Sequence, residues 1–205
     1  MLNRAFKRAG PLGILLVSVL LSCNASIAAE PGFTSVQNIV SVFSGSGSDS
    51  YHNAGSYIDY DAMSQRSLGD AQWSKLTAKQ KHEYTAALKV LMEQRYYPRW
   101  HRIFSKAKVE YVSKAASGSD LLIKTNLVVG KKRDAMTWRL NDRSDKVISL
   151  AIGDRDLLDR LTNRLQPKLK KNGFQAMLSW MQAHAQGEQP ATQTSSAESV
   201  LGESH

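Results

Sequence analysis

Apolar and charged residues divide the start of the chain into a basic head and an apolar segment. Three basic residues lie within the first eight positions, ahead of a nearly continuous apolar run from Leu12 to Leu21. The run is shorter than the about 20 residues that a membrane-spanning helix needs, and the small residues Ser26-Ile27-Ala28-Ala29 follow it. This layout is typical of a secretory signal peptide, so we expect residues 1–29 to be removed on export.

A lipoprotein signal is the alternative reading of this segment. Leu20-Leu21-Ser22-Cys23 resembles the lipobox in which a cysteine is acylated and becomes the new N-terminus, although Leu21 stands where a small or β-branched residue is usual. Cys23 is the only cysteine of the chain. The exported part therefore has no disulfide and depends on its hydrophobic core for stability.

Beyond residue 30, apolar residues spaced three to four apart predict helices. The first helix would contain Phe33, Val36, Ile39, Val40 and Phe43. A Gly/Ser-rich loop, residues 44–48, follows it,. A second helix is expected from Asp59 to Leu68, ending at Gly69,. Thr77 and Gln80 form a capping box at the start of a third, from Ala78 to about Tyr97, which Pro98 ends or kinks,.

The second half of the chain predicts a sheet followed by helices. Four strand-like segments are Val109–Lys114, Leu121–Val129, Ala135–Leu140 and Val147–Ile152. Short polar turns separate them and favour an antiparallel meander. Two more helices are expected, from Asp154 to Leu165 and from Phe174 to His184. The sequence therefore predicts one α+β domain over residues 30–185 and a disordered tail over 186–205.

The net charge narrows the range of partners. The whole chain carries +9, and removing residues 1–29 takes away three of 27 basic residues and none of 18 acidic ones, which leaves +6. Inside a cell this excess would suggest nucleic acid, but export removes that partner. Anionic membrane surfaces or an acidic protein remain.

Catalytic and metal-binding patterns are weak in this sequence. No histidine lies at metal-ligand spacing from a Cys, Asp or Glu, and no nucleotide-binding or nucleophile motif is present,. Asp59 and Asp61 are the best catalytic candidates,, but capping of a short helix explains them better. A basic run surrounds Tyr96, Tyr97 and Trp100 and favours a solvated helix face. We therefore predict no enzyme, no cofactor and no metal.

The order of several motifs resembles that of the MlaC family, the periplasmic phospholipid-binding components of toluene-tolerance type ABC transport systems. The resemblance covers about residues 33–183. It rests on Tyr57-Ile58-Asp59-Tyr60-Asp61-Ala62-Met63, Ser67-Leu68-Gly69, Trp73, Leu76-Thr77-Ala78-Lys79-Gln80, Tyr96-Tyr97, Met136-Thr137-Trp138-Arg139-Leu140, Lys146-Val147 and Asn172-Gly173-Phe174.

This resemblance implies a nuclear-transport-factor-2-like cradle, in which helices wrap a four-stranded antiparallel sheet around an apolar cavity. It also implies a periplasmic carrier that shuttles phospholipid between an outer-membrane lipoprotein–porin complex and an inner-membrane ABC transporter with its lipid-transfer subunit. Such a carrier maintains outer-membrane lipid asymmetry and solvent tolerance. The candidate cavity residues, each of which can also be ordinary core, are Leu68, Trp73, Leu91, Tyr97, Leu122, Val128, Trp138, Leu150, Ile152, Leu157 and Leu158. Because strand faces alternate, only one parity of Leu121–Val129 can face a lipid.

Departures from the family pattern keep other hypotheses open. Ser144-Asp145 replaces a usual Trp, and the segment from Ile148 to Asp156 differs from the expected sequence. One alternative is a carrier of hopanoid or another isoprenoid lipid with the same fold. A second is a small periplasmic enzyme that uses Asp59 or Asp61. A third is an interaction module tethered through Cys23.

Overall fold

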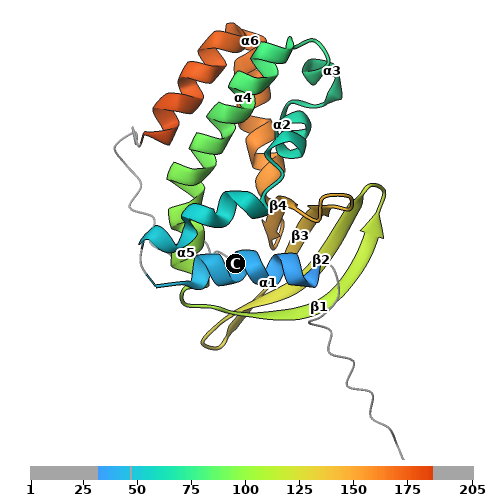
Figure 1. Cartoon of the computed structure of the whole chain (residues 1–205), viewed down its shortest axis with the longest axis vertical. Helices are drawn as coiled ribbons and strands as arrows, with labels where there is room; N and C mark the ends of the chain where they lie inside the picture. The colour runs from blue at the N-terminus through green and yellow to red at the C-terminus, as the bar shows by residue number, and fades with distance from the viewer. Residues whose placement is uncertain (1–31, 47, 187–205) are drawn as a thin grey trace, which may run out of the picture.

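Helices lie against one face and one end of an antiparallel sheet in the computed structural model of the protein (Figure 1). The structure describes residues 32–46 and 48–186. The predicted signal peptide, with Cys23, and the tail beyond Gln186 lie outside these residues. The signal peptide, the lipoprotein alternative and the disordered tail therefore stay predictions.

The first two predicted helices are confirmed. Helix α1, Phe33–Ser44, buries Phe33, Val36, Ile39 and Phe43. Helix α2, Tyr60–Leu68, has Asp59 as its N-cap and ends at Gly69, whose φ of 77° suits glycine,. The 3₁₀ stretch η2, Ser48–Tyr57, and the short helix α3, Asp70–Trp73, lie on either side of α2 and were not predicted.

The third predicted helix continues past Pro98, where Trp100, Ile103 and Phe104 allow a further turn. Helix α4, Ala78–Leu91, starts at the capping box of Thr77 and Gln80. A π-helical turn, η3, Met92–Tyr96, joins it to α5, Tyr97–Phe104. Pro98 lies in the first turn of α5, directly after the π-helical turn, so the helix continues past the proline without ending there,.

The sheet is an antiparallel meander in the order β1-β2-β3-β4-β5. Its strands are β1 Lys108–Ser117, β2 Asp120–Val129, β3 Lys132–Asn141, β4 Val147–Ile152 and β5 Arg155–Asp156. The predicted α+β class with an antiparallel sheet is confirmed. The fifth strand was not predicted: its two residues fold back on the end of β4, pairing Asp156 with Ala151.

The last two predicted helices form one bent element, α6, Leu157–Ala185. It begins three residues later than expected because the preceding residues form β5 and because Asp156 caps its first amides. The first half runs past Leu165 and past Pro167 to the bend at Gly173, which has φ 80° and ψ 175°. The second half then returns beside the first, as the red end of the chain shows (Figure 1).

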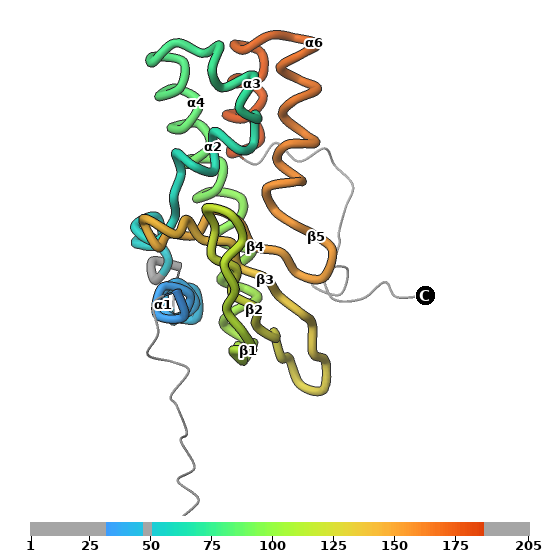
Figure 2. Tube along the Cα trace, turned by 90° about the vertical axis from the view of Figure 1, so that its right-hand side faces the viewer, coloured from blue at the N-terminus to red at the C-terminus, as the bar shows by residue number. Residues whose placement is uncertain are grey.

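One face of the sheet packs on α1 and α5 and forms the core. Ile123, Trp138 and Leu150 lie side by side across β2, β3 and β4 and are buried. The rings of Phe104 and Trp138 stack with centroids 5.7 Å apart. Helix α1 is seen end-on against the sheet in Figure 2. Leu122 and Val128 have the opposite parity and lie on the outward face.

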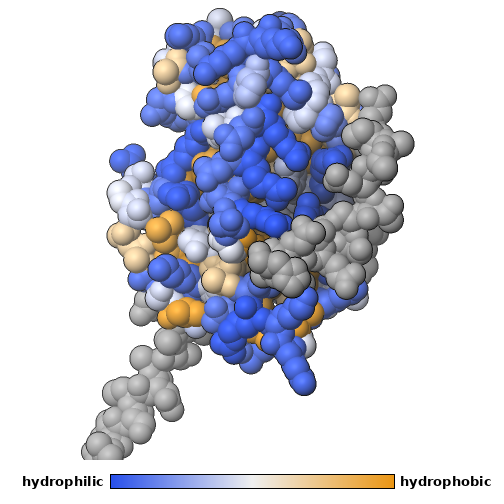
Figure 3. All heavy atoms as spheres, turned by 180° about the vertical axis from the view of Figure 1, so that it is seen from behind, coloured by the Kyte–Doolittle hydropathy of each residue, from blue (hydrophilic) through white to orange (hydrophobic). Residues whose placement is uncertain are grey.

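The surface seen from behind is mostly hydrophilic, with hydrophobic residues gathered in separate patches (Figure 3). Within residues 32–46 and 48–186, no helix has the length and apolar character needed to cross a membrane.

Candidate functional site

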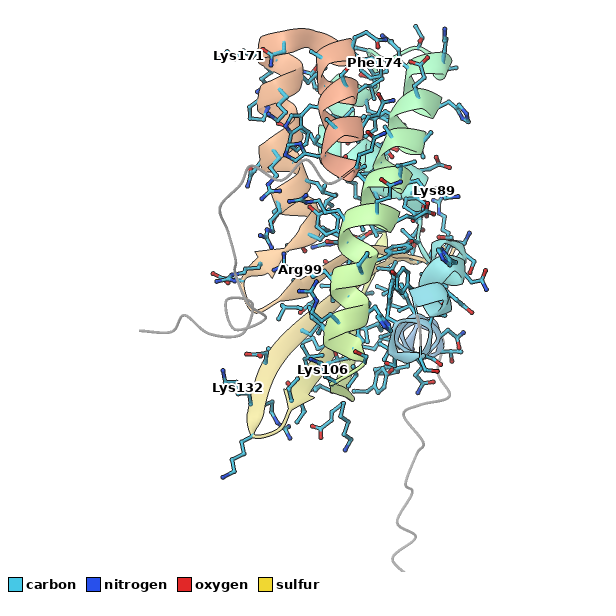
Figure 4. All side chains as sticks on the ribbon, turned by 90° about the vertical axis from the view of Figure 1, so that its left-hand side faces the viewer. Lys89, Arg99, Lys106, Lys132, Lys171 and Phe174 are labelled. Carbon is cyan, nitrogen blue, oxygen red and sulfur yellow. The ribbon has the colours of Figure 1, made fainter. Side chains whose placement is uncertain are left out.

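A cleft lies between α5 and the segment where β4 leads through β5 into α6. Helix α5 and the turn before it contribute Tyr96, Arg99, Trp100 and Ile103. The opposite wall consists of Leu150, Ile152, Arg155, Leu157 and Arg160. The cleft has a volume of about 60 Å³. Arg99 lies on the side of α5 that faces β4 and the start of α6 (Figure 4).

The apolar floor of this cleft is continuous with the core. Trp100, Leu150 and Leu157 are 5%, 4% and 6% exposed. Asp156 fixes the floor on the α6 side, because its carboxylate accepts hydrogen bonds from the Ser149 hydroxyl at 2.7 Å and from the Leu158 amide at 2.7 Å. The β5 turn thereby holds Leu157 against the wall that Leu150 forms.

Arginines form the rim of the cleft. Arg99 is half-buried, and Arg155 and Arg160 are exposed. Burial lowers the pKa of Arg99, and the nearby charge of Arg160 lowers this pKa further. The site therefore combines an apolar floor with a positively charged opening.

The size of the cleft limits what it holds in this conformation. Ligand pockets of proteins usually enclose about 300–1,000 Å³, several times the about 60 Å³ seen here. Room for an acyl chain therefore requires α5 to move away from β4 and α6.

The structure separates the predicted cavity residues into groups. Leu150, Ile152 and Leu157 line the cleft. Leu68, Leu91, Tyr97 and Trp138 lie in the core, and Leu158 packs half-buried against it. Trp73 lines a different groove. Leu122 and Val128 lie on the outward sheet face, away from the cleft, because their parity is opposite to that of the buried Ile123 and Leu127.

Sequence analysis missed most of the cleft rim. Arg99, Tyr96 and Trp100 belong to the basic and aromatic run of the sequence, but that run was interpreted as a solvated helix face. That interpretation holds for its exposed cations Arg102, Lys106 and Lys108. Arg155 comes from the segment that departs from the family pattern, Arg160 lies four residues beyond that segment, and no motif indicated either of them.

A second, open groove of about 630 Å³ runs between α4 and the start of α2. It contains Asp59, Asp61 and Trp73, together with lysines of α4. The Asp59 carboxylate accepts hydrogen bonds from the Ala62 amide, the Asn141 amide group and the Ser144 hydroxyl. The N-cap interpretation of Asp59 is confirmed, and the same carboxylate ties α2 to the β3–β4 turn.

No cluster of three metal-ligating side chains is found among the described residues. The fold and the cleft define an α+β protein with a narrow apolar site and a cationic rim. The family described as MlaC protein matches residues 52–183, more than half of the chain, and the chain belongs to this family.

One solved structure with the same fold is a phospholipid-binding protein from Ralstonia solanacearum, determined in complex with a phospholipid. The TM-score is 0.62 and the identity is 15%, over 75% of this chain and 93% of the other. Among proteins with curated descriptions, none matches the sequence.

Proposed function

We propose that this protein is a periplasmic phospholipid carrier, and the apolar cleft with its cationic rim is the observation that carries the proposal. Membership of the MlaC family supports it, as does the phospholipid complex of the Ralstonia solanacearum protein. Acyl chains enter between α5 and the β4–α6 wall, against Leu150, Ile152 and Leu157. The phosphate-bearing headgroup stays at the arginine rim.

The physical need for a container explains this arrangement. Each methylene exposed to water costs about 0.8 kcal/mol, so two acyl chains represent on the order of 20 kcal/mol. A cleft that opens for these chains exchanges side-chain contacts for lipid contacts of similar character. Tyr97 packs against Trp100, and Trp138 lies beside Leu150, so both become candidates for lining the enlarged cavity. The other candidates belong to the same core or pack against it: Leu68, Leu91 and Leu158.

The partners follow from the proposed carrier role. The protein receives and delivers lipid between an outer-membrane lipoprotein–porin complex and an inner-membrane ABC transporter with its lipid-transfer subunit. This role needs export, and the sequence of residues 1–29 supports it. The intact mass of the protein from its host tests the processing: a start at residue 30 supports a free carrier, and an acylated start at Cys23 supports a tethered one.

The cargo itself provides the main test. Protein purified from its host should release phospholipid on organic extraction, and the extracted protein should take phospholipid up from vesicles. Mass spectrometry of the extract identifies the cargo, so a hopanoid or another isoprenoid would replace the phospholipid assignment. Failure both to release and to take up lipid would overturn the carrier proposal.

The enzyme alternative has a test of its own. Asp59→Asn and Asp61→Asn together should leave lipid uptake unchanged in protein that remains folded, because Asp59 acts as a helix cap and hydrogen-bond acceptor. Loss of function with an unchanged unfolding temperature would favour an enzyme.

A further inference from the structure

Three arginines from separate parts of the chain converge on the mouth of the cleft. Arg99 comes from α5, Arg155 from β5 and Arg160 from the first turns of α6. Sixty-one positions separate Arg99 from Arg160, yet the charge of Arg160 lowers the pKa of Arg99. The fold thus brings like charges together at one opening.

Arg99 and Arg160 differ in this respect from other cations of the described residues, which pair with carboxylates. Arg66 and Arg139 both pair with Asp120, and Arg133 and Lys108 both pair with Glu110. Among the described residues, no carboxylate lies within salt-bridge distance of Arg99 or Arg160. The nearby Asp156 accepts hydrogen bonds at Oδ1 from Ser149 and from the first amides of α6.

Such a group of cations is suited to a phosphate. The guanidinium group presents donors in a planar fork that matches phosphate oxygens, and it keeps its charge when partly buried. An anion here would relieve the repulsion between Arg99 and its neighbours. The apolar floor of Trp100, Leu150 and Leu157 lies in the same cleft as the arginines. The anion that fits this cleft is therefore one attached to a hydrocarbon chain.

We propose that Arg99, Arg155 and Arg160 form a phosphate site that makes the carrier prefer lipids with a net negative headgroup over zwitterionic ones. The attachment to hydrocarbon rests on the proposed carrier function. The preference follows from charge: a zwitterionic headgroup brings a cation to the same rim, whereas a net negative one does not. A neutral isoprenoid lipid would bring no anion to Arg99 and Arg160.

Competition between two lipids tests the preference. Delipidated protein is mixed with vesicles that contain equal amounts of phosphatidylglycerol and phosphatidylcholine with the same acyl chains, and bound lipid is quantified by mass spectrometry. The wild type should be enriched about fivefold in phosphatidylglycerol, as for a few charge pairs at an exposed rim. Arg99→Gln combined with Arg160→Gln should bring the ratio close to one.

A matched variant controls for overall charge. Lys106→Gln combined with Lys132→Gln removes the same charge from exposed positions that do not line the cleft, and it should keep the wild-type ratio. Thermal unfolding establishes that both double variants are folded. An equal ratio in the wild type, or an equal loss in both double variants, overturns the phosphate site and leaves the carrier function standing.

A titration separates lipid phosphate from free phosphate. Inorganic phosphate and soluble glycerophosphoglycerol are added to the delipidated protein, and the side-chain Nε–H resonances of its arginines are followed by NMR. Shifts that disappear in the Arg99→Gln, Arg160→Gln variant support the site. If these anions bind while vesicle lipid does not, the anion site stands and the carrier function falls. If the anions cause no shifts in the wild type and the wild type binds both vesicle lipids equally, the site is refuted.

Discussion

At the scale of single residues, Asp120 holds the sheet to the helical layer. It is 4% exposed and lies at the start of β2. It accepts hydrogen bonds from Arg66, in the last turn of α2, and from Arg139 of β3. The hydrogen bond from Arg66 holds the pKa of Asp120 below its usual range, while burial acts in the opposite direction. The charged form is therefore the one that the fold favours.

Asp120→Asn should lower the free energy of unfolding at pH 7 by about 2 kcal/mol, because hydrogen bonds to a charged acceptor are lost. The folded-state pKa is lower than the unfolded value of about 3.9. The stabilisation is therefore complete above that value and disappears as pH falls through the folded-state pKa. Urea unfolding at a series of pH values from 7 down to 2 measures the difference, which should begin to shrink as the pH falls below about 3.9.

Asp142→Asn is the matched control for this prediction. Asp142 is exposed in the β3–β4 turn, so its replacement should change stability by less than about 0.5 kcal/mol at either pH. A difference between wild type and Asp120→Asn that stays constant down to pH 2 would contradict the role assigned to the charge.

At the scale of elements, the bend of α6 depends on one backbone conformation. Gly173 has φ 80° and ψ 175°, in a region open essentially to glycine alone,. An added Cβ there would meet no other atom within 4 Å. Any cost of a larger residue therefore comes from the backbone and not from crowding.

Gly173→Ala should lower the free energy of unfolding by about 1–3 kcal/mol, the cost of holding alanine in this conformation. Chemical denaturation measures it, with the exposed neighbour Asn172→Ala as the control. Equal stability of the wild type and Gly173→Ala would mean that the bend relaxes into a continuous helix.

The faces of the sheet give a second prediction at this scale. Ile152 lines the cleft, whereas Leu122 lies on the outward face. Ile152→Trp should reduce the lipid bound by about fivefold or more, because overpacking a site costs about 1–3 kcal/mol. Leu122→Trp adds the same ring outside the cleft and should leave bound lipid unchanged. Quantitative lipid extraction compares the two, and equal losses would place the lipid elsewhere.

The elements themselves were largely predictable, since their signals are local. The capping box of Thr77 and Gln80, the glycine after α2 and the polar turns of the sheet each lie within a few residues of the structure that they determine. The π-turn η3 was not predicted, because no local motif in the sequence indicates it. Strand parity was also open, because β2 carries apolar residues at both parities.

At the scale of the whole molecule, one helical rod joins the two ends of the structure. The segment α4–η3–α5 runs from the helical end down to the sheet, where Phe104 stacks on Trp138 (Figure 1). The cleft lies on one side of this rod. Widening it for a lipid therefore means moving the lower part of the rod away from β4 and α6.

The arrangement of the cleft could not be predicted from the sequence, because the fold brings together residues that lie far apart in the chain. Leu150, Ile152 and Leu157 were named from the sequence because apolar residues of a strand and a helix start are easily recognised. Arg155 and Arg160 looked like ordinary surface cations, and only the fold places them beside Arg99. Charges that meet across a cleft leave no periodic pattern in the chain.

Lipid removal tests the carrier at this scale. A ligand that binds only the folded state stabilises it by about 2.7 kcal/mol when its free concentration is 100 times the dissociation constant. For a domain of this size, each kcal/mol raises the melting temperature by about 2–4 °C. Delipidated protein should therefore melt about 5–10 °C lower than protein reloaded from phospholipid vesicles, as measured by circular dichroism.

The Ile152→Trp variant separates cleft binding from a general effect of lipid on the protein. With its cleft partly filled by the indole ring, this variant should show a smaller rise in melting temperature with vesicles than the wild type does. Leu122→Trp should show the full wild-type shift, since its ring lies on the outward face. Because the closed cleft encloses only about 60 Å³, the stabilisation must arise in an opened state that the lipid fills. A wild-type melting temperature that does not respond to lipid would rule out that state.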